Sequence, residues 1–275
     1  MVLITEYRLC LPLSTEEYHI GQLYTCAIAA RNESDGQDGL EIIANEPYED
    51  ERSKGQYTHK ILHLAKHIPR FIRPIIPKSA MLLEEKAWNA YPYCRTVYSN
   101  GYLGDRFYLE VETMHLDDRG DTPNALTVGE EELKSRTVDV IDIVNDELSG
   151  KDYKPEHDLR EWDSSLHPGR GRLGKDWITT HSPVMTAYKT IRVKFNWLGL
   201  STRVERYIMK VIRDVFNKYH RQTVCTMDNW IDFTMDDIRK LEDETKELLD
   251  DTFKKARESG ESPSSEDTAA LESQE

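Results

Sequence analysis

The sequence has few cysteines and no long apolar run. Its four cysteines, at positions 10, 26, 94 and 225, form neither a CxxC pair nor a dense framework, so we expect free thiols in a reducing compartment. No apolar run reaches the length that spans a bilayer, and the N-terminus lacks the basic region and apolar core of a secretion signal. We therefore expect a cytoplasmic protein.

Positive charge is scarce as well. The chain holds 36 Lys and Arg against 50 Asp and Glu, which gives a formal net charge of −14. A nucleic-acid-binding protein needs a basic stripe to neutralise phosphates. Permanent adsorption on an anionic membrane also needs clustered basic residues. The composition argues against both and leaves transient membrane contact open.

Signatures of catalysis and of metal binding are missing. No GxSxG elbow, HExxH motif or Walker loop occurs. Residues 169–174 spell GxGxxG, but no apolar strand precedes them, so we do not expect a dinucleotide site. His59, His63 and His67 recur every four residues, and on a strand we expect surface histidines rather than a zinc site. The sequence predicts no enzyme, no metal and no cofactor.

Residues 56–64, QYTHKILHL, alternate like a strand and place a lysine on the face that should be buried. Because strand side chains point alternately to opposite faces, Thr58 and Lys60 share one face with two leucines. A lysine ammonium is costly to bury unless an anion meets it. A solvated lysine on an edge strand and a closed pocket with a polar floor both fit this strand alone.

Two other segments repeat this pattern. In residues 187–197, AYKTIRVKFNW, Lys189 lies on the apolar side, and in residues 107–113, FYLEVET, the apolar face ends in Thr113. Apolar walls with a few placed polar groups suit a cavity that binds an amphiphile. We therefore expect these strands to surround such a cavity.

The remaining elements follow from periodicity and capping. We expect strands at 6–13, 40–45 and 137–144, a continuous aromatic strand-like segment at 84–99, a turn at 100–101, and a helix from a capping box at 14–17 to about residue 31. A long helix at about 202–223 should pack one stripe on the sheet, made of Val204, Tyr207, Ile208, Val211, Ile212, Val215 and Tyr219.

The C-terminal part divides into a helix and a tail. Thr234 should cap a last helix, in which Glu242 either faces inward toward a lysine or lies at a solvated flank. Residues 258–275 are acidic and of low complexity, so we expect a disordered tail after one domain at 1–257.

Longer motifs carry a family resemblance from residue 1 to about residue 253. EYRLCLPLSTEEYHIGQLY, GQYTHK, EKAWNAYPYCRT, AYKTIRVKFNW and WIDFTMDDIRKLEDET resemble the class I phosphatidylinositol transfer proteins. The resemblance implies an α+β, START-like helix-grip fold, in which a curved antiparallel sheet and long helices enclose a lipid cavity and the C-terminal helix forms part of a lid. It also implies a monomer that exchanges phosphatidylinositol for phosphatidylcholine between membranes without a cofactor.

The same resemblance implies roles for particular residues. The inositol headgroup would be bound by Thr58, Lys60, Glu85, Asn89 and Glu242. The phosphate and choline region would involve Gln22, Cys94, Thr96, Thr113 and Lys189. Membrane contact would be made by Phe71, Ile72, Ile75, Ile76, Trp197 and Leu198. Ser165 matches a regulatory serine.

Other functions remain open at this stage. One is a single-domain carrier that prefers phosphatidic acid, and another is a lipid-sensing partner of a lipid kinase. A third is chemistry on a bound amphiphile, against which the missing paired acids and bases argue.

Overall fold

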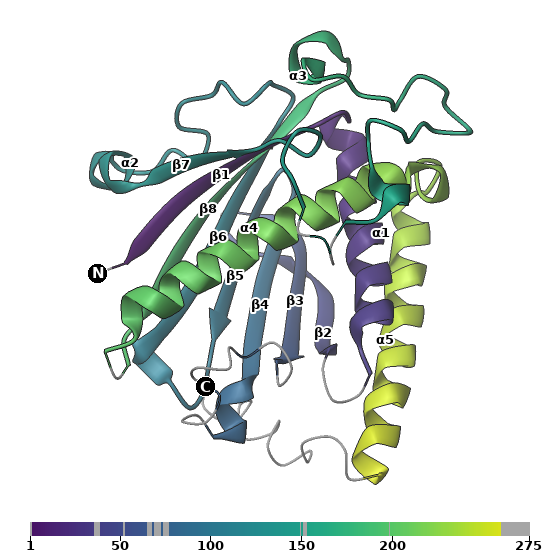
Figure 1. Ribbon diagram of the computed structural model, residues 1–275. Helices are drawn as coiled ribbons and strands as arrows, with labels where there is room; N and C mark the ends of the chain where they lie inside the picture. The colour runs from purple at the N-terminus through teal and green to yellow at the C-terminus, as the bar shows by residue number, and fades with distance from the viewer. Residues whose placement is uncertain are drawn as a thin grey trace.

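The computed structural model describes residues 2–35, 39–51, 53–64, 68, 73, 77–148, 150, 153–197 and 199–259, and Figure 1 shows a sheet crossed by a long helix. The strands are β1 (Leu3–Leu11), β2 (Gly39–Glu49), β3 (Lys54–His63), β4 (Leu82–Ala90), β5 (Tyr93–Ser99), β6 (Phe107–Leu116), β7 (Thr137–Ile141) and β8 (Met185–Phe195). The α-helices are α1 (Thr15–Glu33), α2 (Glu130–Ser135), α3 (Trp177–Thr180), α4 (Ser201–Cys225) and α5 (Met235–Glu258).

The strands form one sheet in the order β2-β3-β4-β5-β6-β8-β1-β7. Neighbouring strands are antiparallel except β1 and β7, so the sheet is mixed and not wholly antiparallel as predicted. The chain between β1 and β7 contains α1, five other strands and α2, and such a long connection permits a parallel pair. The predicted α+β architecture is otherwise confirmed.

Helices α1, α4 and α5 lie on one side of this sheet. Helix α4 crosses it diagonally and contacts β8 and β1, while α1 and α5 run side by side next to the edge strand β2 (Figure 1). Both predicted N-terminal caps are present. Ser14 and Glu17 form the capping box of α1, and Thr234 and Asp237 form that of α5, so each pair satisfies backbone N–H groups that lack a helical partner.

The aromatic segment at 84–99 is two strands and not one. Strand β4 ends at Ala90 and β5 begins at Tyr93, with a turn at Tyr91-Pro92 between them. Proline has no backbone N–H to donate to a ladder, so the chain turns here and pairs back on itself. Asn89 and Cys94 thereby become register partners on adjacent strands.

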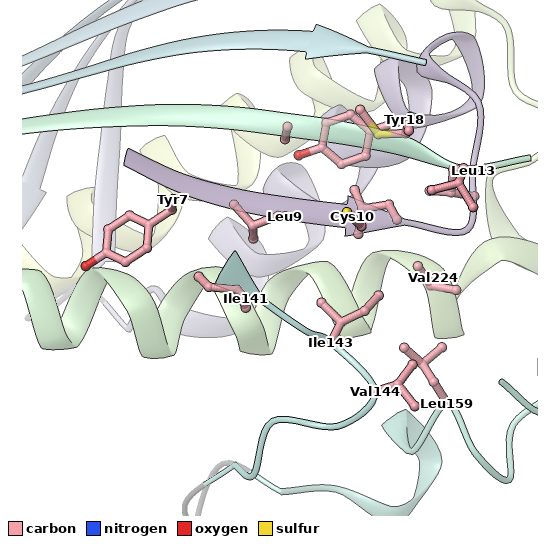
Figure 2. Packing of buried hydrophobic residues seen from close by; sticks show 14 of the residues in the cluster. Tyr7, Leu9, Cys10, Leu13, Tyr18, Ile141, Ile143, Val144, Leu159 and Val224 are labelled. Atoms are coloured by element: carbon pink, nitrogen blue, oxygen red, sulfur yellow. The ribbon is translucent and has the colours of Figure 1, made fainter. Parts of the chain in front are cut away.

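The main core lies between the sheet and α4. Figure 2 shows Tyr7, Leu9 and Ile141 beside this helix, and the Tyr7 hydroxyl donates to the carbonyl oxygen of Met209 at 3.1 Å. Helix α1 approaches closely because residue 21 is glycine. A Cβ atom there would lie 2.7 Å from the ring of the buried Trp230. This approach packs α1 against Trp230 and against Thr223 at the C-terminal end of α4.

The predicted apolar stripe of α4 is only partly correct. Val204 is buried and Ile208 packs against buried residues, but Tyr207, Val211 and Val215 are 38, 39 and 40% exposed. The seven residues form two rows of i, i+4 spacing that together are wider than the face a single sheet can cover. One row packs on the sheet, whereas Tyr207, Val211 and Val215 of the other row face outward.

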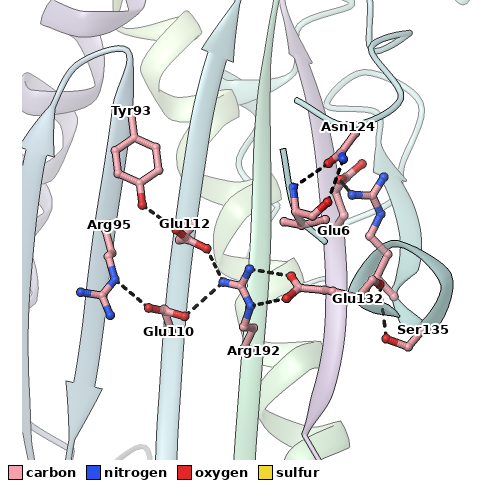
Figure 3. A network of polar contacts seen from close by, with 11 residues as sticks. Glu6, Tyr93, Arg95, Glu110, Glu112, Asn124, Glu132, Ser135 and Arg192 are labelled. Carbon is pink, nitrogen blue, oxygen red and sulfur yellow. Dashed lines mark hydrogen bonds and ion pairs between the residues drawn. The ribbon is translucent and has the colours of Figure 1, made fainter. Parts of the chain in front are cut away.

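The opposite face of the sheet is polar, as the alternation in β8 predicts. Figure 3 shows Arg192 of β8 bridging Glu110 and Glu112 of β6 and Glu132 of α2. The ion pairs to Glu132 attach α2 to this face. Because Arg192 points outward, Lys189, three residues earlier, points to the helix-covered side.

Candidate functional site

A row of polar groups crosses the helix-covered face of the sheet. Lys60 of β3 is paired in register with Glu85 of β4, and Glu85 with Tyr98 of β5. The Lys60 Nζ atom lies 2.8 Å from Glu85 Oε1, and Tyr98 also hydrogen-bonds this carboxylate. Burial lowers the pKa of Lys60, but the carboxylate of Glu85 outweighs it and the pKa is raised, so the ammonium stays charged.

Glu242 of α5 completes this end of the site. Its Oε2 atom accepts hydrogen bonds from Asn45 Nδ2 at 3.0 Å and from Arg239 Nη1 at 2.6 Å. Its negative charge also contributes to the raised pKa of Lys60, so the carboxylate faces inward and not into solvent. Thr58 is buried and is the register partner of Asn45, and its Oγ1 atom has no hydrogen-bond partner among the described residues.

A second row lies four residues away along β4 and β5. Asn89, Cys94, Thr113 and Lys189 are successive register partners on β4, β5, β6 and β8. They therefore lie side by side on the face that α4 covers. Thr113 is buried, whereas the other three are partly accessible.

Lys189 has no anionic partner among the described residues. Its Nζ atom lies 5.3 Å from the centre of the Phe216 ring, and burial lowers its pKa. Burial also raises the pKa of the neighbouring Cys94 thiol to about 11, although the Lys189 charge opposes this. A cation that is partly removed from water and has no counter-ion is unfavourable, so this position suits an anionic ligand.

Histidines near Lys189 add no positive charge of their own. Burial, and then the charge of Lys189, lower the pKa values of His115 and His220 to about 3. The Tyr18 hydroxyl and His220 Nε2 are joined by a hydrogen bond of 2.9 Å. Both rings are therefore neutral at physiological pH, and Lys189 is the positive group of this region.

Cys26 of α1 lies close to both rows. The residue is exposed, yet burial raises its pKa, and the charged groups that act on it are Lys60, Glu85, Lys189 and Glu242. These groups place the thiol on the side of α1 that faces the sheet. Gln22 lies one turn earlier on the same face of α1.

The sequence did not single out four residues of this site. They are Cys26, Asn45, Gln56 and Tyr98. Gln56 Nε2 donates to Asn45 Oδ1 at 2.8 Å, which links β3 to the side chain that binds Glu242. Of these four, only Gln56 could have been predicted from the sequence, because alternation along the strand puts it on the same face as Thr58 and Lys60. The others needed the strand pairing and the placement of α1.

Comparison with known proteins identifies the family. A family model described as "Phosphatidylinositol transfer protein" matches residues 2–247. The chain belongs to this family.

Relatives in the phosphatidylinositol transfer protein family align along almost the whole chain. The rat phosphatidylinositol transfer protein beta isoform is 44% identical over 261 residues, which is 93% of this chain and 96% of that protein. Phosphatidylinositol transfer protein 2 of Dictyostelium discoideum is 47% identical over 250 residues, which is 90% of this chain and 95% of that protein. These matches confirm the resemblance to the class I proteins.

The membrane-contact residues of the predicted family pattern are only partly visible. Phe71, Ile72, Ile75, Ile76 and Leu198 lie outside the described residues. Trp197 is described. It packs in a small cluster with Phe195, Leu103 and Val204, and its ring centre lies 6.2 Å from that of the exposed Tyr102.

Ser165 and the predicted surface histidines complete the comparison. Ser165 is exposed, and its backbone N–H donates to Asp228 Oδ2 at 2.7 Å. Asp228 belongs to neither row of the site. His63 is not a surface histidine. It is 2% exposed, and its Nε2 atom lies 2.6 Å from Glu41 Oε1 because α5 covers this end of the sheet.

No group of three His, Cys, Asp or Glu side chains is placed to bind a metal ion within the described ranges. No helix in that part of the chain has the length and apolar character needed to cross a bilayer.

Proposed function

We propose that this protein takes one phospholipid into the hollow between the sheet and its helices and exchanges phosphatidylinositol and phosphatidylcholine between membranes. The single observation that carries the proposal is Lys189, a half-buried cation without an anionic partner among the described residues, next to apolar strand faces. A lipid phosphate provides the missing charge, and acyl chains suit the apolar walls. Family membership and the names of the relatives support it.

The energetic need for such a carrier follows from the lipid itself. A diacyl lipid has roughly thirty methylenes, and each costs about 0.8 kcal/mol to expose to water, so free passage costs on the order of 20 kcal/mol. A protein wall that replaces the bilayer around the acyl chains removes most of this cost. Continuous contact with water would restore it, so the helices must cover the chains during transit.

We assign selectivity between lipid headgroups to the first row of polar residues and its neighbours. Thr58, Lys60 and Glu242 offer a hydroxyl, an ammonium and a carboxylate, which can pair with the hydroxyls of an inositol ring and its phosphate. Choline has neither donor nor acceptor for them. Lys189 serves the phosphate that both lipids contain.

We further propose that the protein performs no chemistry on its cargo. The pKa of the Cys94 thiol is raised to about 11, so little thiolate forms at neutral pH. The pKa of His115 is lowered to about 3, which makes its imidazole a weak base. We place the protein in the cytoplasm as a monomer that touches membranes transiently.

The test combines cargo identification with transport. Native mass spectrometry of the full chain purified from cells should find one phosphatidylinositol or one phosphatidylcholine per monomer. The same preparation should move both lipids between donor and acceptor vesicles. A preparation that contains only phosphatidic acid, or that moves neither lipid, contradicts the proposal.

A further inference from the structure

Asn45 of β2 links the sheet to the carboxylate of Glu242 on α5. Its Nδ2 atom donates to Glu242 Oε2 at 3.0 Å, and its Oδ1 atom accepts from Gln56 Nε2 of β3 at 2.8 Å. Three side chains from three elements thus form one chain of hydrogen bonds. Gln56 is the register partner of Asn89, and Glu242 interacts electrostatically with Lys60, so the chain runs from the second row of the site to the first.

The direction of this hydrogen-bond chain follows from the chemistry of its ends. An ionised carboxylate can only accept hydrogen bonds, so the amide of Asn45 must turn its NH2 group toward Glu242. The oxygen of the same amide then faces β3, where the NH2 group of Gln56 meets it. With the amide turned over, its oxygen would face the carboxylate and its NH2 group would face another NH2 group. The two contacts therefore support the same orientation of Asn45.

Arg239 offers the same carboxylate a partner nearer to solvent. It lies three residues before Glu242 on α5, and its Nη1 atom is 2.6 Å from Glu242 Oε2. The side chain of Arg239 is 36% exposed, whereas that of Glu242 is 15% exposed. An ion pair within one helix does not decide whether the carboxylate turns to solvent or to the sheet. Asn45 is the hydrogen-bond partner from the sheet among the described residues, so it holds the carboxylate inward.

The second oxygen of Glu242 is left for a ligand. Both hydrogen-bond donors meet Oε2, and no described residue donates to Oε1. Electrostatic interactions of Glu242 with Lys60 and with Cys26 place its carboxylate between the first row and the side of α1 that faces the sheet. A carboxylate oxygen in this position can accept a hydrogen bond from a ligand hydroxyl.

Other contacts hold α5 in place without Asn45. Arg31 of α1 donates to Thr245 Oγ1 of α5 at 2.7 Å. Nearer the C-terminal end of the helix, Arg257 forms an ion pair with Glu41 of β2. Both contacts remain when Asn45 is changed. The contact made by Asn45 therefore contributes the orientation of one carboxylate more than the attachment of the helix.

We propose that Asn45 and Gln56 are positioning residues for headgroup selectivity. Gln56 fixes the amide of Asn45, Asn45 fixes the carboxylate of Glu242, and the Oε1 atom of that carboxylate accepts a hydroxyl of the inositol ring. Choline has no hydroxyl to donate, so its binding does not depend on this chain of hydrogen bonds. The inference rests on the proposed function, in which Glu242 meets the headgroup, and adds two residues that act through it.

The first experiment measures transfer of phosphatidylinositol and of phosphatidylcholine between vesicles by the full chain. Asn45→Leu removes both hydrogen bonds and keeps a side chain of similar size. It should lower phosphatidylinositol transfer about tenfold, because a hydrogen bond to a charged group is lost, and should leave phosphatidylcholine transfer unchanged. Equal loss of both lipids would mean that Asn45 only fastens α5 to β2, and that result overturns the proposal.

The matched control removes the same kind of contact elsewhere. Asn145 also donates from Nδ2 to a carboxylate, that of Asp142, at 2.7 Å. It follows β7, at the edge of the sheet opposite β2. Asn145→Leu should therefore leave the ratio of the two transfer rates unchanged. If Asn45→Leu does not fold, as circular dichroism would show, Asn45→Ser replaces it, because serine is too short to reach Glu242.

A second experiment tests whether Gln56 acts through Asn45. Gln56→Glu replaces the NH2 group by an oxygen, so the amide of Asn45 can meet it only by turning its own NH2 group away from Glu242. Phosphatidylinositol transfer should fall about tenfold, because the same charged hydrogen bond is lost. Combined with Asn45→Leu, the change should lower it less than about twofold further, since the contact is already absent. Equal factors in the two backgrounds would show that the new charge acts on the lipid directly, which contradicts the proposal.

The unmodified protein keeps the two proposals distinct. If it transports neither lipid, the proposed function fails. If it transports both lipids and the Asn45 and Gln56 variants keep its ratio of phosphatidylinositol to phosphatidylcholine transfer, this inference fails and the proposed function stands.

Discussion

At the scale of single residues, the two lysines of the site have different tasks. Lys60 is neutralised by Glu85, whereas Lys189 has no anionic partner among the described residues. Lys60→Ala should reduce phosphatidylinositol transfer about tenfold or more and spare phosphatidylcholine, because a hydrogen bond to a charged group is worth about 1.5–3 kcal/mol. Lys189→Ala should reduce both, since both lipids have a phosphate. Vesicle transfer assays with each lipid measure this.

Thr58→Ala provides the control for that comparison. It removes a hydroxyl and no charge from the same face, so it should also affect only phosphatidylinositol, and circular dichroism should show that all three variants fold. Equal loss of both lipids in the Lys60 variant would make this lysine a general phosphate group.

A second residue-scale prediction concerns the thiol of Cys94. A bulky maleimide should block transfer of both lipids, because the thiol lies in register between Asn89 and Thr113. Since its pKa is about 11, the thiolate fraction rises about tenfold per pH unit below that value, and labelling should accelerate accordingly. Peptide mass spectrometry measures labelling, with Cys94→Ser as the control. Normal transfer by fully labelled protein would place the thiol outside the cargo space.

At the scale of elements, α5 is fastened to the sheet at its C-terminal end. Arg257 forms an ion pair with Glu41 of β2, which also binds the buried His63 of β3. Arg257→Gln should increase local opening of the last turns of α5 on the order of tenfold, because a charged hydrogen bond is lost. Hydrogen exchange should then be faster in those turns, and lipid exchange faster as well.

The control for this prediction is on the same helix. Lys254→Gln removes an exposed cation for which the described residues show no ion pair with Glu41. It should change neither the rate of hydrogen exchange nor the rate of lipid exchange. If Arg257→Gln leaves hydrogen exchange in α5 unchanged, the ion pair does not hold the helix.

The corner between β8 and α4 yields another element-scale prediction. Trp197 and the exposed Tyr102 present adjacent rings, and aromatic side chains favour the membrane interface. Trp197→Ala should slow transfer several-fold while native mass spectrometry still finds lipid bound. Tyr153→Ala, an exposed tyrosine on another segment, is the control. An unchanged transfer rate would remove Trp197 from the membrane contact.

At the scale of the whole molecule, the cargo is part of the folded state. A lipid that binds only the folded chain stabilises it, by about 2.7 kcal/mol at a hundredfold excess over Kd. For a chain of this size that shifts Tm by about 5–10 °C. Protein stripped of lipid should therefore unfold at a lower temperature by calorimetry, and phosphatidylcholine should restore the value. Identical Tm values with and without lipid would contradict binding within the fold.

Sequence reasoning predicted local structure well where the signal was local. The alternation in β3, β6 and β8 placed Thr58, Lys60, Thr113 and Lys189 on one side of the sheet, and the capping boxes located the starts of α1 and α5. It failed where the outcome depends on distant neighbours. His63 was expected at the surface because the sequence does not reveal that α5 covers the end of β3.

The sequence by itself determined the strand faces, the caps and the family, because side-chain periodicity, capping hydrogen bonds and long motifs are properties of contiguous residues. Only the tertiary structure decided which lysine has a partner, since Glu85 meets Lys60 through strand pairing while no acid among the described residues reaches Lys189. It also decided which row of α4 is buried, because a sheet can cover only one side of a helix.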